Sequence, residues 1–147
     1  VMKTCENDQF FASTTFGGDC LGLAATKAVL AELPRHLDRM VEAGSKLTVT
    51  FDTAFGDAAR CKGFPTRTMF DFPTTEHKAL FWQECVKKGV LFGYSNFIMA
   101  AHLVEPILET TCQVVTEASK TVLKHWKNPN AKIEGDMPVE VFRLVRR

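Results

Sequence analysis

Hydrophobic residues recur at intervals of three and four residues between positions 35 and 58, and charged residues fill the positions between them. This spacing places the apolar side chains on one face of a helix and the charges on a solvated opposite face. Pro34 just before the stretch suits the first turn of such a helix. The predicted inner face consists of Leu37, Met40, Val41, Gly44, Leu47 and Phe51.

Three further stretches have the pattern of helices. The first, from about 18 to 33, is rich in glycine and alanine, which would let it pack closely against a neighbour. The second runs from about 75 to 88 and meets a plausible stop at Gly89. The third spans about 104 to 126, and its predicted inner stripe is Leu108, Thr111, Val115, Ala118 and Val122.

Alternating and β-favouring runs predict short strands between these helices. A turn at 63–65 leads into an alternating strand that begins at Thr66 and that Pro73 ends. Further predicted strands cover 90–92, 96–100 and 139–145. The resulting order of helices and strands predicts an α+β fold, in which helices cover a small antiparallel sheet.

The composition removes several classes of function. The 147 residues carry a formal net charge of only +1, which gives no electrostatic reason to expect nucleic acid or a membrane as partner. No apolar run approaches the roughly 20 residues that cross a bilayer, and no signal peptide is visible. The five cysteines are widely spaced and form no zinc-like pair, so we expect a cytoplasmic protein without a metal site.

The stretch 13–25, Ser-Thr-Thr-Phe-Gly-Gly-Asp-Cys-Leu-Gly-Leu-Ala-Ala, holds the strongest candidate chemistry. A glycine pair leads into a helix start, whose unpaired N–H groups suit a phosphate, and Thr14 and Thr15 could add hydroxyl donors. The same residues are also compatible with an ordinary helix cap at Gly18 or Asp19. No Gly-x-x-x-x-Gly-Lys pattern supports a nucleotide site.

This stretch resembles a segment of the class III aminotransferases that depend on pyridoxal 5'-phosphate (PLP), and it is closest to the glutamate-1-semialdehyde aminomutase-like branch. A second similar region comprises residues 88–92, 96–98 and 101–102. In that family the threonine of the first segment binds the cofactor phosphate of the neighbouring subunit. The resemblance therefore implies PLP as cofactor, a homodimer, Thr15 as phosphate ligand and the backbone of Thr14 as its companion.

The resemblance also implies how the chain is divided. Residues 1–33 would be the tail end of the large PLP-binding domain, and residues 34–147 the C-terminal small domain of a fold-type I enzyme. The family's Schiff-base lysine motif is absent, because Lys3 is too close to Thr15 and no Asn-Gly follows it. We therefore expect the back part of a longer enzyme, with no catalytic residue in this chain and no activity of the chain alone.

The full-length enzyme would move an amino group from a small-molecule donor to an aldehyde or ketone, or shift it within one molecule as an aminomutase does. Arg67 is a candidate ligand for a substrate carboxylate, or else an ordinary surface or salt-bridging arginine. Tyr94 and Ser95 could line the substrate mouth or belong to an ordinary loop. His102 is either a structural residue at a strand end or a substrate contact.

Two other functions remain open from the sequence. A non-catalytic α+β interaction domain without cofactor would use its apolar helix faces for a partner, and the missing lysine motif favours it. A phosphate-binding module for another ligand is the third possibility. The Thr-Thr-Phe-Gly-Gly segment favours the enzyme.

Overall fold

The computed structural model describes residues 18–104 and 106–137. The chain divides into two compact units between Leu37 and Asp38. This division lies four residues after the boundary that the sequence suggests, and the assignment of the two parts to a large and a small domain stays a prediction.

The first unit contains helix α2, Cys20–Glu32, and the short 3₁₀ helix η1, Leu33–Arg35, which has Pro34 in its first turn. The helix was predicted from the sequence over about 18–33 and is confirmed with slightly shorter bounds. None of the residues of α2 is buried. Four large apolar side chains on it are exposed, namely those of Leu21, Leu23, Val29 and Leu30.

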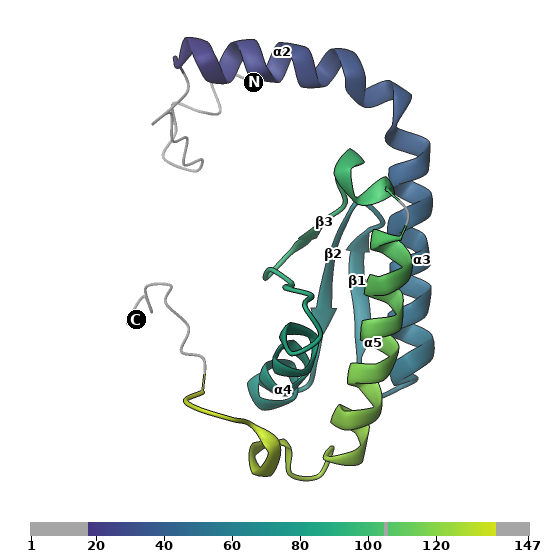
Figure 1. Ribbon diagram of the computed structural model, residues 1–147, viewed down its shortest axis with the longest axis vertical. Coiled ribbons are helices and arrows are strands. Elements are labelled where there is room, and N and C mark those ends of the chain that lie inside the picture. The colour runs from purple at the N-terminus through teal and green to yellow at the C-terminus, as the bar shows by residue number, and fades with distance from the viewer. Residues whose placement is uncertain (1–17, 105, 138–147) are drawn as a thin grey trace, which may run out of the picture. The chain divides into compact units, whose positions relative to one another are not determined.

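The second unit combines a small antiparallel sheet with three helices (Figure 1). Its helices are α3, Leu37–Phe55; α4, Thr75–Val86; and α5, Ile107–Lys124. Its strands, in the order β1-β2-β3, are Arg60–Phe64, Arg67–Asp71 and Asn96–Phe97. The 3₁₀ helices η2, Ala100–Leu103, and η3, Pro129–Lys132, complete the unit. The predicted α+β class with a small helix-covered antiparallel sheet is confirmed.

Phenylalanines from the sheet and two helices form the centre of this unit. Phe51 of α3 stacks on Phe70 of β2 with ring centroids 4.3 Å apart, and Phe81 of α4 meets Phe51 edge-on at 5.7 Å. The cluster as a whole consists of Phe51, Phe55, Phe70, Phe72, Phe81 and Phe92. Burial of aromatic rings in such geometries is a strong source of packing energy, so this cluster fixes how α3 and α4 lie on the sheet.

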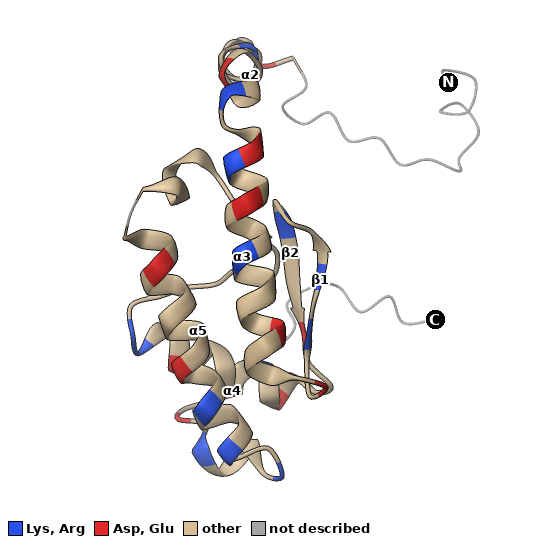
Figure 2. Cartoon of the chain, turned by 90° about the vertical axis from the view of Figure 1, so that its right-hand side faces the viewer, with Lys and Arg blue, Asp and Glu red and all other residues tan. Residues whose placement is uncertain are grey.

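Helix α3 presents nearly the face that its sequence predicts. Its buried residues are Met40, Ala43, Gly44, Leu47, Phe51 and Phe55. Leu37 and Val41 were predicted on this face but are partly exposed. Gly44 lies against the backbone of Pro65, so the contact centres on Gly44 and leaves Val41 at its edge. Figure 2 shows charges of both signs along the helix, as expected for a solvated face.

Strand β1 was not predicted, because its residues lack a clear alternation of apolar and polar types. Its strand geometry comes from pairing with β2, in the register Cys61 with Phe70. The Asp52 carboxylate of α3 accepts a hydrogen bond from the Cys61 N–H at 2.7 Å and fixes the strand to the helix.

Two strand predictions are corrected by the structure. Residues 90–92 do not form a strand, since they pair with no described strand, and of the predicted strand 96–100 only Asn96–Phe97 is present. The predicted strand 139–145 lies outside the described residues. The two later helices are confirmed with shorter bounds: Gly89, at φ +81°, follows α4, and Pro106 caps α5 instead of lying inside it.

Candidate functional site

The N-terminus of α2 is already occupied by a carboxylate. Asp19 is the N-cap, and its Oδ2 accepts the N–H of Gly22 at 2.8 Å. This is the ordinary cap that the sequence left as one of two alternatives, and its negative charge disfavours an anion at the same N–H groups. Thr14 and Thr15, the predicted phosphate ligands, lie outside the described residues, so their assignment stays a prediction.

The structure brings two of the three predicted substrate residues together. Arg67 begins β2, and its Nε donates a hydrogen bond to Ser95 Oγ at 3.4 Å. The Arg67 guanidinium also lies over the ring of Phe97, with Cζ 5.0 Å from the ring centroid. Arg67 forms no ion pair with a described residue, which leaves its charge available to an anionic group.

Tyr94, the third predicted substrate residue, contacts Lys78 of α4 and not the Arg67–Ser95 pair. Its ring, exposed at the surface, receives the Lys78 ammonium of α4, with Nζ 4.2 Å from the ring centroid. The same Nζ lies 4.8 Å from the ring centroid of Trp82. Tyr94 and Lys78 thus form a cation–π pair that is separate from the Arg67–Ser95 contact.

A mainly apolar cavity of about 210 Å³ lies beside Ser95. Leu47 of α3, the loop residues 90–93 and the residues Ile107 and Leu108 of α5 form apolar walls. Ser95, Asn96, His102 and Thr111 supply its polar groups. Arg67 and Tyr94 are not among the lining residues, so of the predicted substrate residues only Ser95 and His102 reach this cavity.

His102 has a structural role and also faces the cavity. Its Nδ1 accepts a hydrogen bond from the N–H of Met99 at 3.0 Å, which caps η2. A nitrogen that accepts this bond holds a lone pair, so neutral His102 carries its proton on Nε2. The sequence offered a structural role or a substrate contact for His102, and its position in the structure is compatible with both.

Asn96 was not singled out from the sequence. It lies opposite Thr68 across β2 and β3 and is buried. Neither of its amide atoms, nor the Thr68 hydroxyl, has a hydrogen-bond partner among the described residues. Buried polar groups are normally paired, so these three buried atoms are exceptions in the packing between β2 and β3. Asn96 is buried because it pairs with Thr68, which lies 28 residues earlier in the sequence. No local sequence pattern indicates such a long-range pairing.

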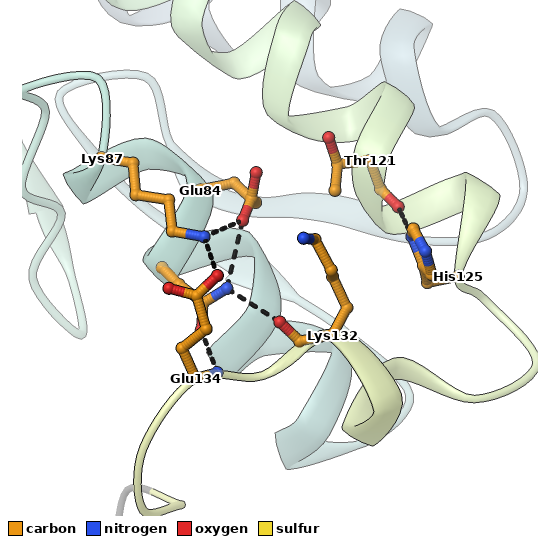
Figure 3. A network of polar contacts seen from close by, with 7 residues as sticks. Glu84, Lys87, Thr121, His125, Lys132 and Glu134 are labelled. Carbon is orange, nitrogen blue, oxygen red and sulfur yellow. Dashed lines mark hydrogen bonds and ion pairs between the residues drawn. The ribbon is translucent and has the colours of Figure 1, made fainter.

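A polar network at the far end of α4 was also invisible in the sequence (Figure 3). Lys87 Nζ contacts Glu84 at 3.0 Å and Glu134 at 2.7 Å. Burial alone would raise the pKa of Glu84, but hydrogen bonds from Gln83 and Lys87 outweigh it and lower that pKa. The network joins residues about fifty positions apart and has the features of a structural anchor.

Two of the described cysteines, Cys85 and Cys61, are poorly suited to act as nucleophiles. Burial raises the pKa of the Cys85 thiol to about 12 and also raises that of Cys61. A protonated thiol is a poor nucleophile and metal ligand. Within the described ranges no group of three His, Cys, Asp or Glu could hold a metal ion, and none of the described helices has the length and apolar character to cross a membrane.

No family model matches the sequence, and no curated protein matches it. A solved structure does match: the PLP internal aldimine form of the FumI protein of Sphingopyxis sp. MTA144, with a TM-score of 0.61 and 17% sequence identity. The match covers 82% of this chain and 31% of the FumI chain. This chain has the fold of part of the FumI chain. It spans about a third of the length of that neighbour, and at this identity the likeness concerns the fold alone.

The described residues do not form a complete PLP site. The Asp19 carboxylate accepts the Gly22 N–H at the start of α2, where a phosphate could otherwise bind, and the lysines of the chain lie in no motif typical of a Schiff base. Any cofactor would therefore be held chiefly by residues outside the described part, with Thr14 and Thr15 as this chain's candidates.

Proposed function

We propose that this chain is the C-terminal portion of a PLP-dependent aminotransferase or aminomutase-like enzyme. The observation that carries the proposal is the fold likeness to FumI over 82% of the chain. The Thr-Thr-Phe-Gly-Gly-Asp segment at 14–19 independently supports the same family and favours its glutamate-1-semialdehyde aminomutase-like branch. PLP, when bound, acts as an electron sink for reactions at the carbon that carries an amino group.

In this proposal the chain supplies one cofactor contact and part of a wall. The hydroxyl of Thr15 and the N–H of Thr14 would donate hydrogen bonds to the phosphate of the cofactor in the other subunit of a homodimer. This arrangement agrees with the Asp19 cap, because the phosphate would be bound ahead of the helix and not at its N-terminus. The catalytic lysine would come from the part of the enzyme that precedes this chain.

The substrate wall would be formed around Ser95. The Arg67 guanidinium, held at Ser95 by a 3.4 Å hydrogen bond, would attract a substrate carboxylate. The apolar cavity next to Ser95 would accept a part of the amino donor or of the aldehyde or ketone acceptor. Tyr94 would lie at the rim, with its ring engaged by Lys78.

A non-catalytic interaction domain is the second candidate. The observation that favours it is the exposure of every residue of α2, including Leu21 and Leu30. Exposed apolar side chains on one helix are typical of a surface that another protein covers. The same exposure agrees with the enzyme, in which the rest of the large domain or the other subunit would cover this helix.

Replacement of Thr15 by alanine in the full-length protein tests the proposal. Loss of a hydrogen bond to a charged phosphate should weaken PLP binding by roughly 1–3 kcal/mol in a spectroscopic titration. Ser13→Ala is the matched control, because it removes a neighbouring hydroxyl that has no assigned role, and it should leave PLP affinity unchanged. Equal PLP affinity of the wild type and the Thr15→Ala variant would contradict the assignment, and a full-length protein that binds no PLP would favour the interaction domain.

A further inference from the structure

A second hollow of the C-terminal unit is an open groove of about 410 Å³ along α4. Trp82 and Val86 of α4, the loop residue Leu91 and Ile133 after η3 form its apolar surface. Leu91 is 84% exposed and Val86 is 52% exposed. Large apolar side chains gathered in one groove indicate a surface that another segment covers.

The backbone N–H and C=O groups along one wall of the groove have no backbone partners among the described residues. Residues 91–93 make no backbone–backbone hydrogen bond with the described part of the chain, although Val90 N–H donates to the Cys85 carbonyl oxygen at 3.0 Å. The residue types of 90–92 favour a strand, yet the stretch has no strand partner among the described residues. Such a stretch is a ready template for an added strand.

The network of Figure 3 holds the chain at the edge of this groove. Gln83 Nε2 donates to the Lys132 carbonyl oxygen at 3.1 Å, and the N–H of Glu134 donates to Gln83 Oε1 at 2.7 Å. Glu134 and Asp136 both line the groove. The chain therefore lies at the groove from Ile133 to Asp136, one residue before the described part ends at Met137.

Ten residues follow, Pro138 to Arg147, with the sequence Pro-Val-Glu-Val-Phe-Arg-Leu-Val-Arg-Arg. In extended form they could reach about 33 Å, more than enough to run along α4. Residues 139–145 favour a strand by type and alternation. These ten residues contain three arginines and one glutamate, so their net charge is positive. That charge complements the carboxylate of Asp136, which makes no ion pair with any described residue.

We propose that residues 138–147 dock into the groove along α4 as an extended strand that pairs with residues 90–93. The docked segment covers Val86, Leu91 and Ile133. Leu91 and Phe92 also line the cavity beside Ser95. Docking therefore fixes a wall of that cavity, and the inference stands whether or not the chain belongs to a PLP enzyme.

Amide hydrogen exchange of the intact protein tests this proposal. The amides of 91–93 and of 139–145 should exchange at least about ten-fold more slowly than in an unstructured peptide. Val141→Asp places a charge on one face of the extended segment, and Phe142→Asp places a charge on the opposite face. At least one of them should remove the protection of both stretches together, while the amides of the β1–β2 hairpin keep theirs. Glu140→Gln is the matched control and should leave both stretches protected.

Three results would overturn the proposal. In the first, residues 139–145 exchange at unprotected rates in the wild type, whether or not 91–93 are protected, which would leave the groove open or assign it to another occupant. In the second, protection of both stretches falls on dilution, which would make a second copy of the chain the partner. In the third, neither aspartate variant changes the exchange of 91–93.

Discussion

The α-carbon of Gly44 in helix α3 packs directly against the backbone carbonyl oxygen of Pro65, at the turn between β1 and β2. A Cβ on Gly44 would overlap that oxygen. The carbonyl group belongs to the tight turn of a paired hairpin and cannot move aside as the end of a flexible side chain can. This contact sets how closely the helix approaches the sheet, whose strands position Arg67 and Asn96.

We expect Gly44→Ala to destabilise the C-terminal unit by about 1–3 kcal/mol, the usual cost of overpacking. Alanine is the better helix former by about 1 kcal/mol, but overlap with backbone atoms outweighs that gain. Denaturant unfolding, followed by the fluorescence of Trp82 and Trp126, measures the change. Ser45→Ala on the same helix is the control, and a Gly44→Ala variant as stable as this control would contradict the packing described.

The second prediction concerns acid stability. The pKa of Glu84 is lowered in the folded state, because hydrogen bonds from Gln83 and Lys87 outweigh the burial that would raise it. Its contribution to stability is therefore present above the ordinary glutamate pKa and is lost as the pH falls through the lowered value. Glu84→Gln should reduce the loss of stability in acid, as measured by denaturant unfolding between pH 7 and pH 3. An equal loss of stability in acid for the wild type and the Glu84→Gln variant would contradict the role given to Glu84.

The third prediction concerns the thiols. Burial raises the pKa of Cys85 to about 12, so its thiol stays protonated and inaccessible at neutral pH. Brief treatment of the native protein with iodoacetamide should modify the exposed Cys20 and spare Cys85, as seen by peptide mass spectrometry. Modification of Cys85 at a rate similar to that of Cys20 would show that the core around it opens readily.

The elements that could be predicted are those whose own residues specify them. Helix α3 has a strong period, α4 is followed by a glycine at positive φ, and β2 alternates between buried and exposed residues. Strand β1 could not be predicted, since pairing with β2 and the Asp52 hydrogen bond impose its geometry from outside. Residues 90–92 show the converse, because their types favour a strand but no described strand pairs with them.

The candidate site shows the same limit. The sequence singled out Arg67 and Ser95 separately, but their contact depends on the pairing of β2 with β3 across 28 residues. Asn96, buried by that pairing, gives no local signal. Thr14 and Thr15 rest on a motif alone and lie outside the described residues.

The fourth prediction concerns Arg67, whose guanidinium forms no ion pair with a described residue. In the full-length enzyme, Arg67→Gln should raise KM about ten-fold for an amino donor that carries a carboxylate, the scale of one lost charge-assisted hydrogen bond. It should leave KM unchanged for a neutral amine donor. Arg60→Gln, on the neighbouring strand and paired with Asp57, is the control. Equal changes for both donors would show that Arg67 does not bind a carboxylate.

The central claim is that this chain is part of a PLP enzyme whose catalytic lysine lies outside it. Borohydride reduction of the purified full-length protein, followed by peptide mass spectrometry, tests this claim most directly. We predict a phosphopyridoxyl group on one lysine that precedes this sequence and on none of the lysines within residues 1–147. A protein that carries no PLP, or one that is labelled at a lysine of this chain, would contradict the account.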